Sequence, residues 1–207
     1  MPAAGRPHMR GDARVPTTFN SWIQSELTAT RGTKESKAKG QRLEALLARV
    51  LCSVRGMTLE DQDVENAYET EEIDLYFWND RARDGLHFLD CPLIVECKAW
   101  SRPVSGRELR TFATLLRDKG RSSGIFVALE GIAGEARQRS AGFFHLASAM
   151  AGGQTVLVVT GADLETVDSP ADLIRLLRRR MLDQVRGQVL AIEGSRRGRK
   201  RERGESK

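Results

Sequence analysis

Cys91-Pro-Leu-Ile-Val-Glu-Cys-Lys98 is the stretch around which the rest of the chain is organised. Pro92 can open a strand but not continue it, because it lacks the backbone donor that a ladder needs. Residues 93–95 form a continuous apolar run, which is typical of a strand buried on both faces. Glu96 and Lys98 end the run on one face, because strand side chains alternate. Two charges at the end of a buried strand are costly to desolvate without partners, which indicates a functional role.

A second acid lies in a similar setting in the stretch Glu72-Ile-Asp-Leu-Tyr-Phe77. Its apolar residues alternate with polar ones, which predicts another strand. Asp74 is the acid that we expect to act, with Glu72 as its competitor. We prefer Asp74 because the alternation places Ile73 and Leu75 together on the opposite face.

A carboxylate on one strand and a Glu-x-Lys on the next form a cradle for a metal ion with a basic group beside it. Hard cations such as Mg²⁺ are bound by one or two carboxylates together with substrate phosphate and water. The ion neutralises charge on a phosphodiester and activates a water molecule, which Lys98 can orient or deprotonate. The two strands therefore predict phosphodiester hydrolysis.

At these residues the sequence resembles the PD-(D/E)xK nuclease superfamily, since Ile73-Asp74 stands at the "PD" and Glu96-Cys97-Lys98 at the "(D/E)xK". The resemblance implies a restriction-endonuclease-like α/β fold, a three-layer α/β/α sandwich around a mixed sheet. It also implies that Asp74, Glu96 and the backbone carbonyl of Cys97 hold Mg²⁺, for which Mn²⁺ substitutes.

The segment Gly40–Leu51 carries the clearest helical pattern of the first half, with an apolar stripe at Leu43, Leu46, Leu47 and Val50. Glu44 falls on the margin of that stripe. Such an acid can simply be a surface residue whose stem packs on the core. The superfamily, however, has a glutamate on its first core helix that leans into the metal site, so the resemblance adds Glu44 to the catalytic residues.

Within the superfamily the chain is most similar to the type IV restriction, Mrr-like branch, over roughly residues 39–166. Glu96 stands where that branch often has Gln and agrees with the commoner superfamily form. The motifs that carry the similarity are Gly40…Leu43-Glu44, Glu72-Ile73-Asp74, Gly131-Ile132…Ala136 and Asp163-Leu164.

The remaining elements follow from caps and apolar runs. Ser105 and Glu108 form a capping box that opens a helix ending near Gly120. The other expected elements are a first strand at 64–68, a turn at 79–85, a strand at 124–129, a helix from about 131 to 150, a strand at 155–159 and a helix after Ser169-Pro170.

The net charge of +5 is unevenly distributed. Residues 1–42 and 196–207 each carry +5, which leaves −5 between them. Basic ends on an acidic body favour a nucleic-acid partner, although solvated ends that keep the protein in solution are the alternative. The expected nucleic-acid contacts are Arg102, Arg110, Arg196, Arg197, Arg199, Lys200 and Arg201.

We expect three regions in the chain: an N-terminal segment at 1–38 with a short helix and a basic linker, a nuclease domain at 39–190, and a basic tail at 191–207. No apolar run is long enough to span a bilayer, and the N-terminus lacks the apolar core of a signal peptide, which predicts a cytoplasmic protein. The three cysteines and three histidines match no zinc spacing.

These features predict a Mg²⁺-dependent endonuclease that hydrolyses DNA, of restriction or defence type. One alternative is a non-catalytic nucleic-acid-binding or assembly module on the same fold. Another is a junction-resolving or RNA-directed nuclease, so RNA stays open as a partner. The sequence contains no evident recognition domain, which leaves a homodimer or a partner chain as the source of specificity.

Overall fold

The structure of the chain is a computed structural model that describes residues 18–65, 72–133 and 152–185. The predicted helix near 131–150 and the basic tail lie outside the described residues. The helices are α1 (Phe19–Gly32), α2 (Ser36–Cys52), α3 (Gly106–Asp118), α5 (Gly161–Leu164) and α6 (Pro170–Val185). The strands are β1 (Met57–Glu65), β2 (Glu72–Asn79), β3 (Leu93–Lys98), β4 (Ser123–Ala128) and β5 (Thr155–Thr160).

The five strands form one mixed sheet in the order β1-β2-β3-β4-β5. β1, β2 and β3 are antiparallel neighbours, whereas β3, β4 and β5 run parallel. The parallel pairing of β3 with β4 is made possible by the crossover through α3, because a parallel pair needs a long connection of this kind. β3 is therefore the strand at which the two halves of the sheet meet.

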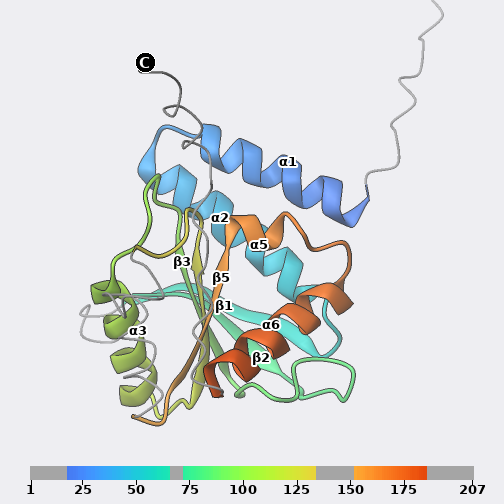
Figure 1. The fold of residues 1–207 in the computed structure, drawn as a ribbon, viewed down its shortest axis with the longest axis vertical. Coiled ribbons are helices and arrows are strands. Elements are labelled where there is room, and N and C mark those ends of the chain that lie inside the picture. The colour runs from blue at the N-terminus through green and yellow to red at the C-terminus, as the bar shows by residue number, and fades with distance from the viewer. Residues whose placement is uncertain (1–17, 66–71, 134–151, 186–207) are drawn as a thin grey trace, which may run out of the picture.

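Helices cover both faces of the sheet (Figure 1): α3 lies on one side, and α1, α2, α5 and α6 lie on the other. The central strands are buried on both faces, so their side chains divide between two cores. Val95 and Cys97 belong to the larger core under α2, while Ile94 belongs to the smaller core under α3. The predicted α/β sandwich is confirmed.

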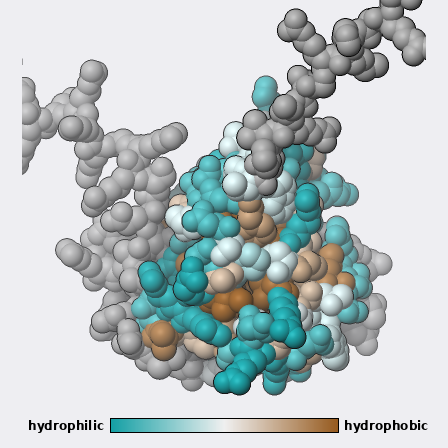
Figure 2. Space-filling view, turned by 90° about the vertical axis from the view of Figure 1, so that its right-hand side faces the viewer, coloured by the Kyte–Doolittle hydropathy of each residue, from teal (hydrophilic) through white to brown (hydrophobic). Residues whose placement is uncertain are grey.

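The surface of the molecule is mostly hydrophilic on the face that Figure 2 shows, with hydrophobic residues exposed among the hydrophilic ones near its middle. Among the described residues, the exposed large hydrophobic side chains are Trp78 and Leu182. None of the described helices combines the length and the hydrophobicity that a membrane span requires.

The first strand begins earlier than the predicted strand at 64–68. β1 starts at Met57, and Thr58 already pairs with Trp78 of β2. β1 is an edge strand with one neighbour, so acidic residues such as Glu60 and Asp61 stay exposed on it. The prediction missed this strand because its dense acidic residues resemble a loop, and residues 66–68 lie outside the described residues.

The first core helix also begins earlier than the predicted Gly40. Glu35 caps α2, because its carboxylate accepts hydrogen bonds from the backbone N–H groups of Lys37 and Ala38. The predicted basic linker therefore shortens to residues 33–35. Helix α1 packs Ile23 and Leu27 into the same core as α2; the domain boundary at residue 39 stays a prediction.

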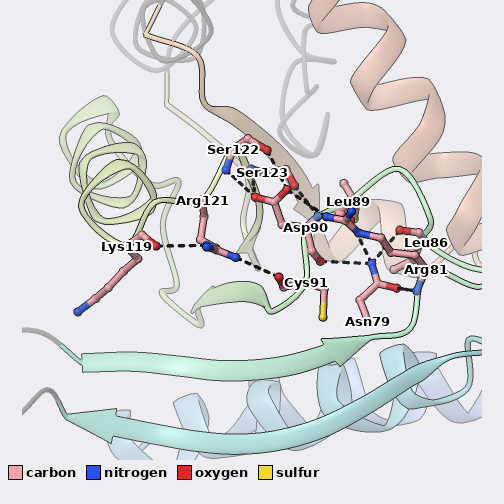
Figure 3. Close-up of polar contacts among 10 residues, drawn as sticks. All are labelled: Asn79, Arg81, Leu86, Leu89, Asp90, Cys91, Lys119, Arg121, Ser122 and Ser123. Atoms are coloured by element: carbon pink, nitrogen blue, oxygen red, sulfur yellow. Dashed lines mark hydrogen bonds and ion pairs between the residues drawn. The ribbon is translucent and has the colours of Figure 1, made fainter.

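The segment between β2 and β3 folds around one buried amide (Figure 3). The side-chain amide of Asn79 donates hydrogen bonds to the carbonyl oxygens of Leu86, Leu89 and Asp90, at 2.9, 3.3 and 3.3 Å. Leu86 and Leu89 are themselves fully buried. The predicted turn is therefore an ordered loop that contributes to the core.

The same loop is fastened to the start of β4 (Figure 3). The carboxylate of Asp90 accepts hydrogen bonds from the backbone N–H groups of Ser122 and Ser123 and from the Ser122 hydroxyl. Arg121 donates to the carbonyl oxygen of Cys91 at 3.0 Å. These bonds hold the N-terminal end of β3 beside that of β4. Because the two strands are parallel, their carboxyl ends then also lie side by side, at the other end of the strands.

Candidate active site

A cavity of about 1210 Å³ lies at the carboxyl end of β3. One wall comes from the junction of α1 and α2, and the other from the end of β3 and the segment 99–102. Four of the predicted residues line it: Glu44, Asp74, Lys98 and Arg102, together with Cys97. The cavity thus gathers side chains from α2, β2, β3 and the segment that follows β3.

Asp74 is held against β3 by a backbone hydrogen bond. The pairing of β2 with β3 extends from Phe77↔Leu93 to Leu75↔Val95. Beyond that pair, the backbone N–H of Cys97 donates to the Asp74 carboxylate, with 2.5 Å between N and Oδ2. A side chain thus takes the place of a ladder partner, and the acid on β2 is fixed beside the Glu-x-Lys.

Glu96 and Lys98 form an ion pair, as two residues on one face of a strand can. Both side chains are largely buried, with 14% and 26% of their surfaces exposed. Burial opposes the charged form of Lys98, but the charge and hydrogen bond of Glu96 and the charge of Asp74 outweigh it and raise the pKa of Lys98. Lys98 is therefore a protonated hydrogen-bond donor at neutral pH in this arrangement.

Glu44 is buried on α2, with 8% of its surface exposed. A Cβ atom on Gly40, one turn earlier, would lie 3.4 Å from Glu44 Oε1. The side chain therefore turns toward the N-terminal part of the helix, where the cavity lies. Glu44, on the margin of the apolar stripe, is therefore a cavity residue and not a surface residue.

Three acids lie in the neighbourhood of Cys97. Burial strongly raises the pKa of the Cys97 thiol, and the nearby charges of Asp74, Glu96 and Glu44 raise it further, while Lys98 acts in the opposite direction. All four charged groups thus lie close enough to Cys97 to act on its thiol. The sequence placed these residues far apart in the chain, and the fold brings them together.

The donor chemistry of this group fits a hard divalent cation, because its side chains offer carboxylate oxygens at one end of the sheet. Within residues 18–65, 72–133 and 152–185, no three His, Cys, Asp or Glu side chains stand ready to hold a metal ion together. The carboxylate of Glu96 is directed to Lys98 in the arrangement described here. The roles of these residues as metal ligands stay predictions.

Of the predicted nucleic-acid contacts, the cavity includes Arg102, whose guanidinium lies 4.8 Å from the ring centroid of Trp100. Arg110 is exposed on α3 and is not among the cavity residues. The basic residues of the tail, 196–201, lie outside the described residues. The expectation for Arg110 and for the tail therefore rests on the sequence alone.

Sequence reasoning missed Lys39, which lines the cavity and is buried. The signal was available, because Lys39 continues the apolar stripe of Leu43, Leu47 and Val50 by one turn. A lysine at a position where the helical pattern predicts burial indicates a functional role, as the charged residues at the end of β3 do. Its partner Ser101 carried no signal, because the segment after β3 has no repeating pattern.

A comparison with protein-family models finds a match to the Mrr catalytic domain, described as a restriction endonuclease, over residues 36–165. The match covers more than half of the chain and contains α2, the whole sheet and the cavity residues from Ser36 to Arg102. A search of curated proteins found no match. The chain belongs to the restriction endonuclease family, in the Mrr-like branch of the PD-(D/E)xK nucleases.

Proposed function

We propose that the protein is a divalent-metal-dependent endonuclease that hydrolyses DNA phosphodiester bonds, of restriction or defence type, and that it acts in the cytoplasm. The observation that carries this proposal is the hydrogen bond from Cys97 N–H to Asp74. It joins the acid of one strand to the middle residue of the Glu-x-Lys on the next, and Asp74, Cys97 and Lys98 line the cavity, whereas Glu96 is not among its lining residues. The family of the chain supports the same reaction class.

Asp74, Glu96 and the carbonyl of Cys97 are the proposed ligands of Mg²⁺, with Mn²⁺ as a substitute. Glu44 completes the acidic group. A bound divalent cation supplies charge neutralisation at the phosphate and lowers the pKa of a coordinated water molecule. Glu96 must then divide its carboxylate between this role and its ion pair with Lys98.

Lys98 is the proposed orienting group. As a protonated amine it donates hydrogen bonds, so it can position the attacking water and stabilise the negative charge that develops on the phosphate. Hydrolysis adds the water oxygen to phosphorus and breaks the bond to one ester oxygen, which leaves with a proton. The raised pKa favours this donor role over the alternative in which Lys98 removes the proton.

DNA is the proposed substrate because the cavity rim is basic. Lys34, Lys37 and Arg102 line it; Lys34 is an exposed lysine between α1 and α2, and Lys37 is an exposed lysine in the first turn of α2. Basic side chains around an acidic centre attract the phosphate backbone while the acids bind a cation. A homodimer or a partner chain is the proposed source of sequence specificity.

A second candidate is a non-catalytic nucleic-acid-binding module. The observation that favours it is the pairing of Glu96 with Lys98, because a plain structural ion pair at a strand end has the same geometry. In that case the acids would stabilise the fold and would not bind a cation.

The deciding experiment is cleavage of supercoiled plasmid and of linear duplex DNA in Mg²⁺, in Mn²⁺ and in EDTA. We compare the wild type with Asp74→Asn, Lys98→Met and the control Asp80→Asn, whose acid is exposed at the end of β2 and outside the cavity. A nuclease loses activity in the first two variants and in EDTA. Metal-independent cleavage, or equal cleavage by all the proteins, would rule out this site as the catalytic centre.

A further inference from the structure

Lys39 is a buried lysine in the wall of the cavity. Only 7% of its surface is exposed, although it lies near the N-terminal end of α2. Taking an ammonium group out of water costs several kcal/mol unless a partner compensates it. The position is therefore unfavourable for folding by itself, and the compensating partner has to be identified.

The partner that the fold supplies is a neutral hydroxyl. Lys39 Nζ donates to Ser101 Oγ at 2.6 Å, which joins α2 to the segment that follows β3. The ion pairs of the described residues do not include Lys39. A hydroxyl satisfies one of the three N–H donors and none of the charge, so two donors of Lys39 stay available to an acceptor that enters the cavity.

Beside its acids, the cavity offers several groups that suit an anion. Lys39 and Ser101 line the same cavity as Asp74 and Lys98, and Arg102 follows directly after Ser101. The hydroxyl of Ser101 accepts from Lys39 and keeps its own hydrogen for another acceptor. The backbone donors at the start of α2 are taken by Glu35, so the side chains carry this site, and the helix end does not.

We propose that Lys39 and Ser101 form a phosphate-binding subsite, which holds a backbone phosphate of the nucleic acid beside the acids of the cavity. The inference rests on the proposed function, because it names a further residue pair that binds the same substrate. Lys39 contributes the charge and one or two N–H donors, and Ser101 contributes an O–H donor from the opposite wall. Phosphate contacts of this kind fix the register of the nucleic acid in the site.

The test is the salt dependence of binding to a duplex DNA oligonucleotide in EDTA, where cleavage does not interfere. Each phosphate contact made by a charged side chain contributes about 0.9 to the slope of log K against log salt concentration. Lys39→Met should therefore lower the slope by about 0.9, and Lys39→Arg should keep it. Ser101→Ala should weaken binding a few-fold and leave the slope unchanged, because a hydroxyl carries no charge.

Lys119→Met is the matched control, because Lys119 follows α3 and is not among the cavity residues. Its slope should equal that of the wild type. The melting temperature gives a second readout: a lysine retained for binding costs stability, so Lys39→Met should melt at the wild-type temperature or above it. A structural role would instead lower the melting temperature and leave the slope unchanged.

The results separate this inference from the proposed function. If the wild type cleaves DNA but Lys39→Met keeps the full slope, the phosphate subsite is wrong and the nuclease stands. If the slope falls as expected but the wild type never cleaves in Mg²⁺ or Mn²⁺, the subsite stands and the nuclease is wrong. A wild type that does not bind the oligonucleotide, or a Lys39→Arg slope as low as that of Lys39→Met, overturns the subsite.

Discussion

The backbone nitrogen of Cys97 and the carboxylate oxygen Oδ2 of Asp74 lie 2.5 Å apart, beyond the last paired residues of β2 and β3. This bond makes the side chain of Asp74 both a structural acceptor and a proposed metal ligand. The two roles can be separated by substitution, because Asn keeps an acceptor oxygen and Ala does not.

Asp74→Asn should retain the bond from Cys97 and lose at least the roughly 10–100-fold in activity that altered metal-site partners cost. Asp74→Ala should lose the same activity and also about 1–3 kcal/mol of stability, because it leaves the N–H of Cys97 without its acceptor. Plasmid cleavage and urea unfolding measure the two effects. Equal stability of the two variants would contradict the structural role of this bond.

Lys98→Met should lower cleavage by about 100- to 1000-fold, the usual cost of removing one donor from a site of developing charge. It should also cost about 1–3 kcal/mol of stability, because Glu96 loses its partner in a largely buried position. Chemical unfolding and single-turnover cleavage measure both effects. The double variant Glu96→Gln with Lys98→Met should recover part of the stability and none of the activity.

Divalent ions should stabilise the wild-type protein. An ion that binds the folded chain at 100 times its Kd adds about 2.7 kcal/mol to the free energy of unfolding. Calorimetry with Mn²⁺ should give binding to the wild type and to the Asp80→Asn control, and weaker binding to Glu44→Gln and Glu96→Gln. No Mn²⁺ binding to the wild type would count against the metal site and leave the fold untouched.

The sequence was sufficient for the central elements of the fold. Continuous apolar runs such as 93–95 predict strands buried on both faces, and the Ser105–Glu108 capping box located the start of α3. The start of the edge strand β1 was not predicted. β1 has a single neighbouring strand and an exposed face, so it can carry acidic residues that are otherwise typical of a loop. The apolar pattern therefore predicts strands where burial determines the residue type, and it does not predict an exposed strand at the edge of the sheet.

The candidate site divides in the same way. Glu96 and Lys98 could be placed on one face from the alternation of their strand. The reason for preferring Asp74 was wrong, because Ile73 packs in the smaller core and Leu75 in the larger one, so these two residues do not share a face. The contact between Lys39 and Ser101 could not be predicted from the sequence. It joins α2 to an irregular segment 62 residues away in the chain, which has no repeating apolar pattern. Contacts between a helix and an irregular segment depend on the whole fold.

Asp90 should contribute stability that depends on pH. Burial would raise its pKa, but the hydrogen bonds from Ser122 and Ser123 prevail and hold the pKa below the ordinary value of 3.8. The folded state thus favours the charged form, and this contribution is complete above pH 3.8 and is lost as the pH falls through the lower pKa of the folded state. Asp90→Ala should cost about 2–3 kcal/mol at pH 7. The difference from the wild type should shrink in acid, and a constant difference from pH 7 to pH 2 would contradict this.

Helix α1 should be part of the folded unit. Leu27 is fully buried in the larger core, so Leu27→Ala should cost about 2–5 kcal/mol in one cooperative unfolding transition. Ser25→Ala, on the exposed face of the same helix, should change stability by less than about 0.5 kcal/mol. Thermal unfolding followed by circular dichroism measures both, and a separate early transition in Leu27→Ala would instead place α1 outside the domain.

Cys97 is buried in the larger core beside the cavity, Cys91 is half-buried, and Cys52 is exposed at the end of α2. An alkylating reagent should therefore modify Cys52 first and Cys91 more slowly in the native protein, and should reach Cys97 when the core around it opens. The rate at which Cys97 is alkylated thus reports how often the site opens. The rate for Cys52 serves as the reference within the same chain, and no label has to be introduced.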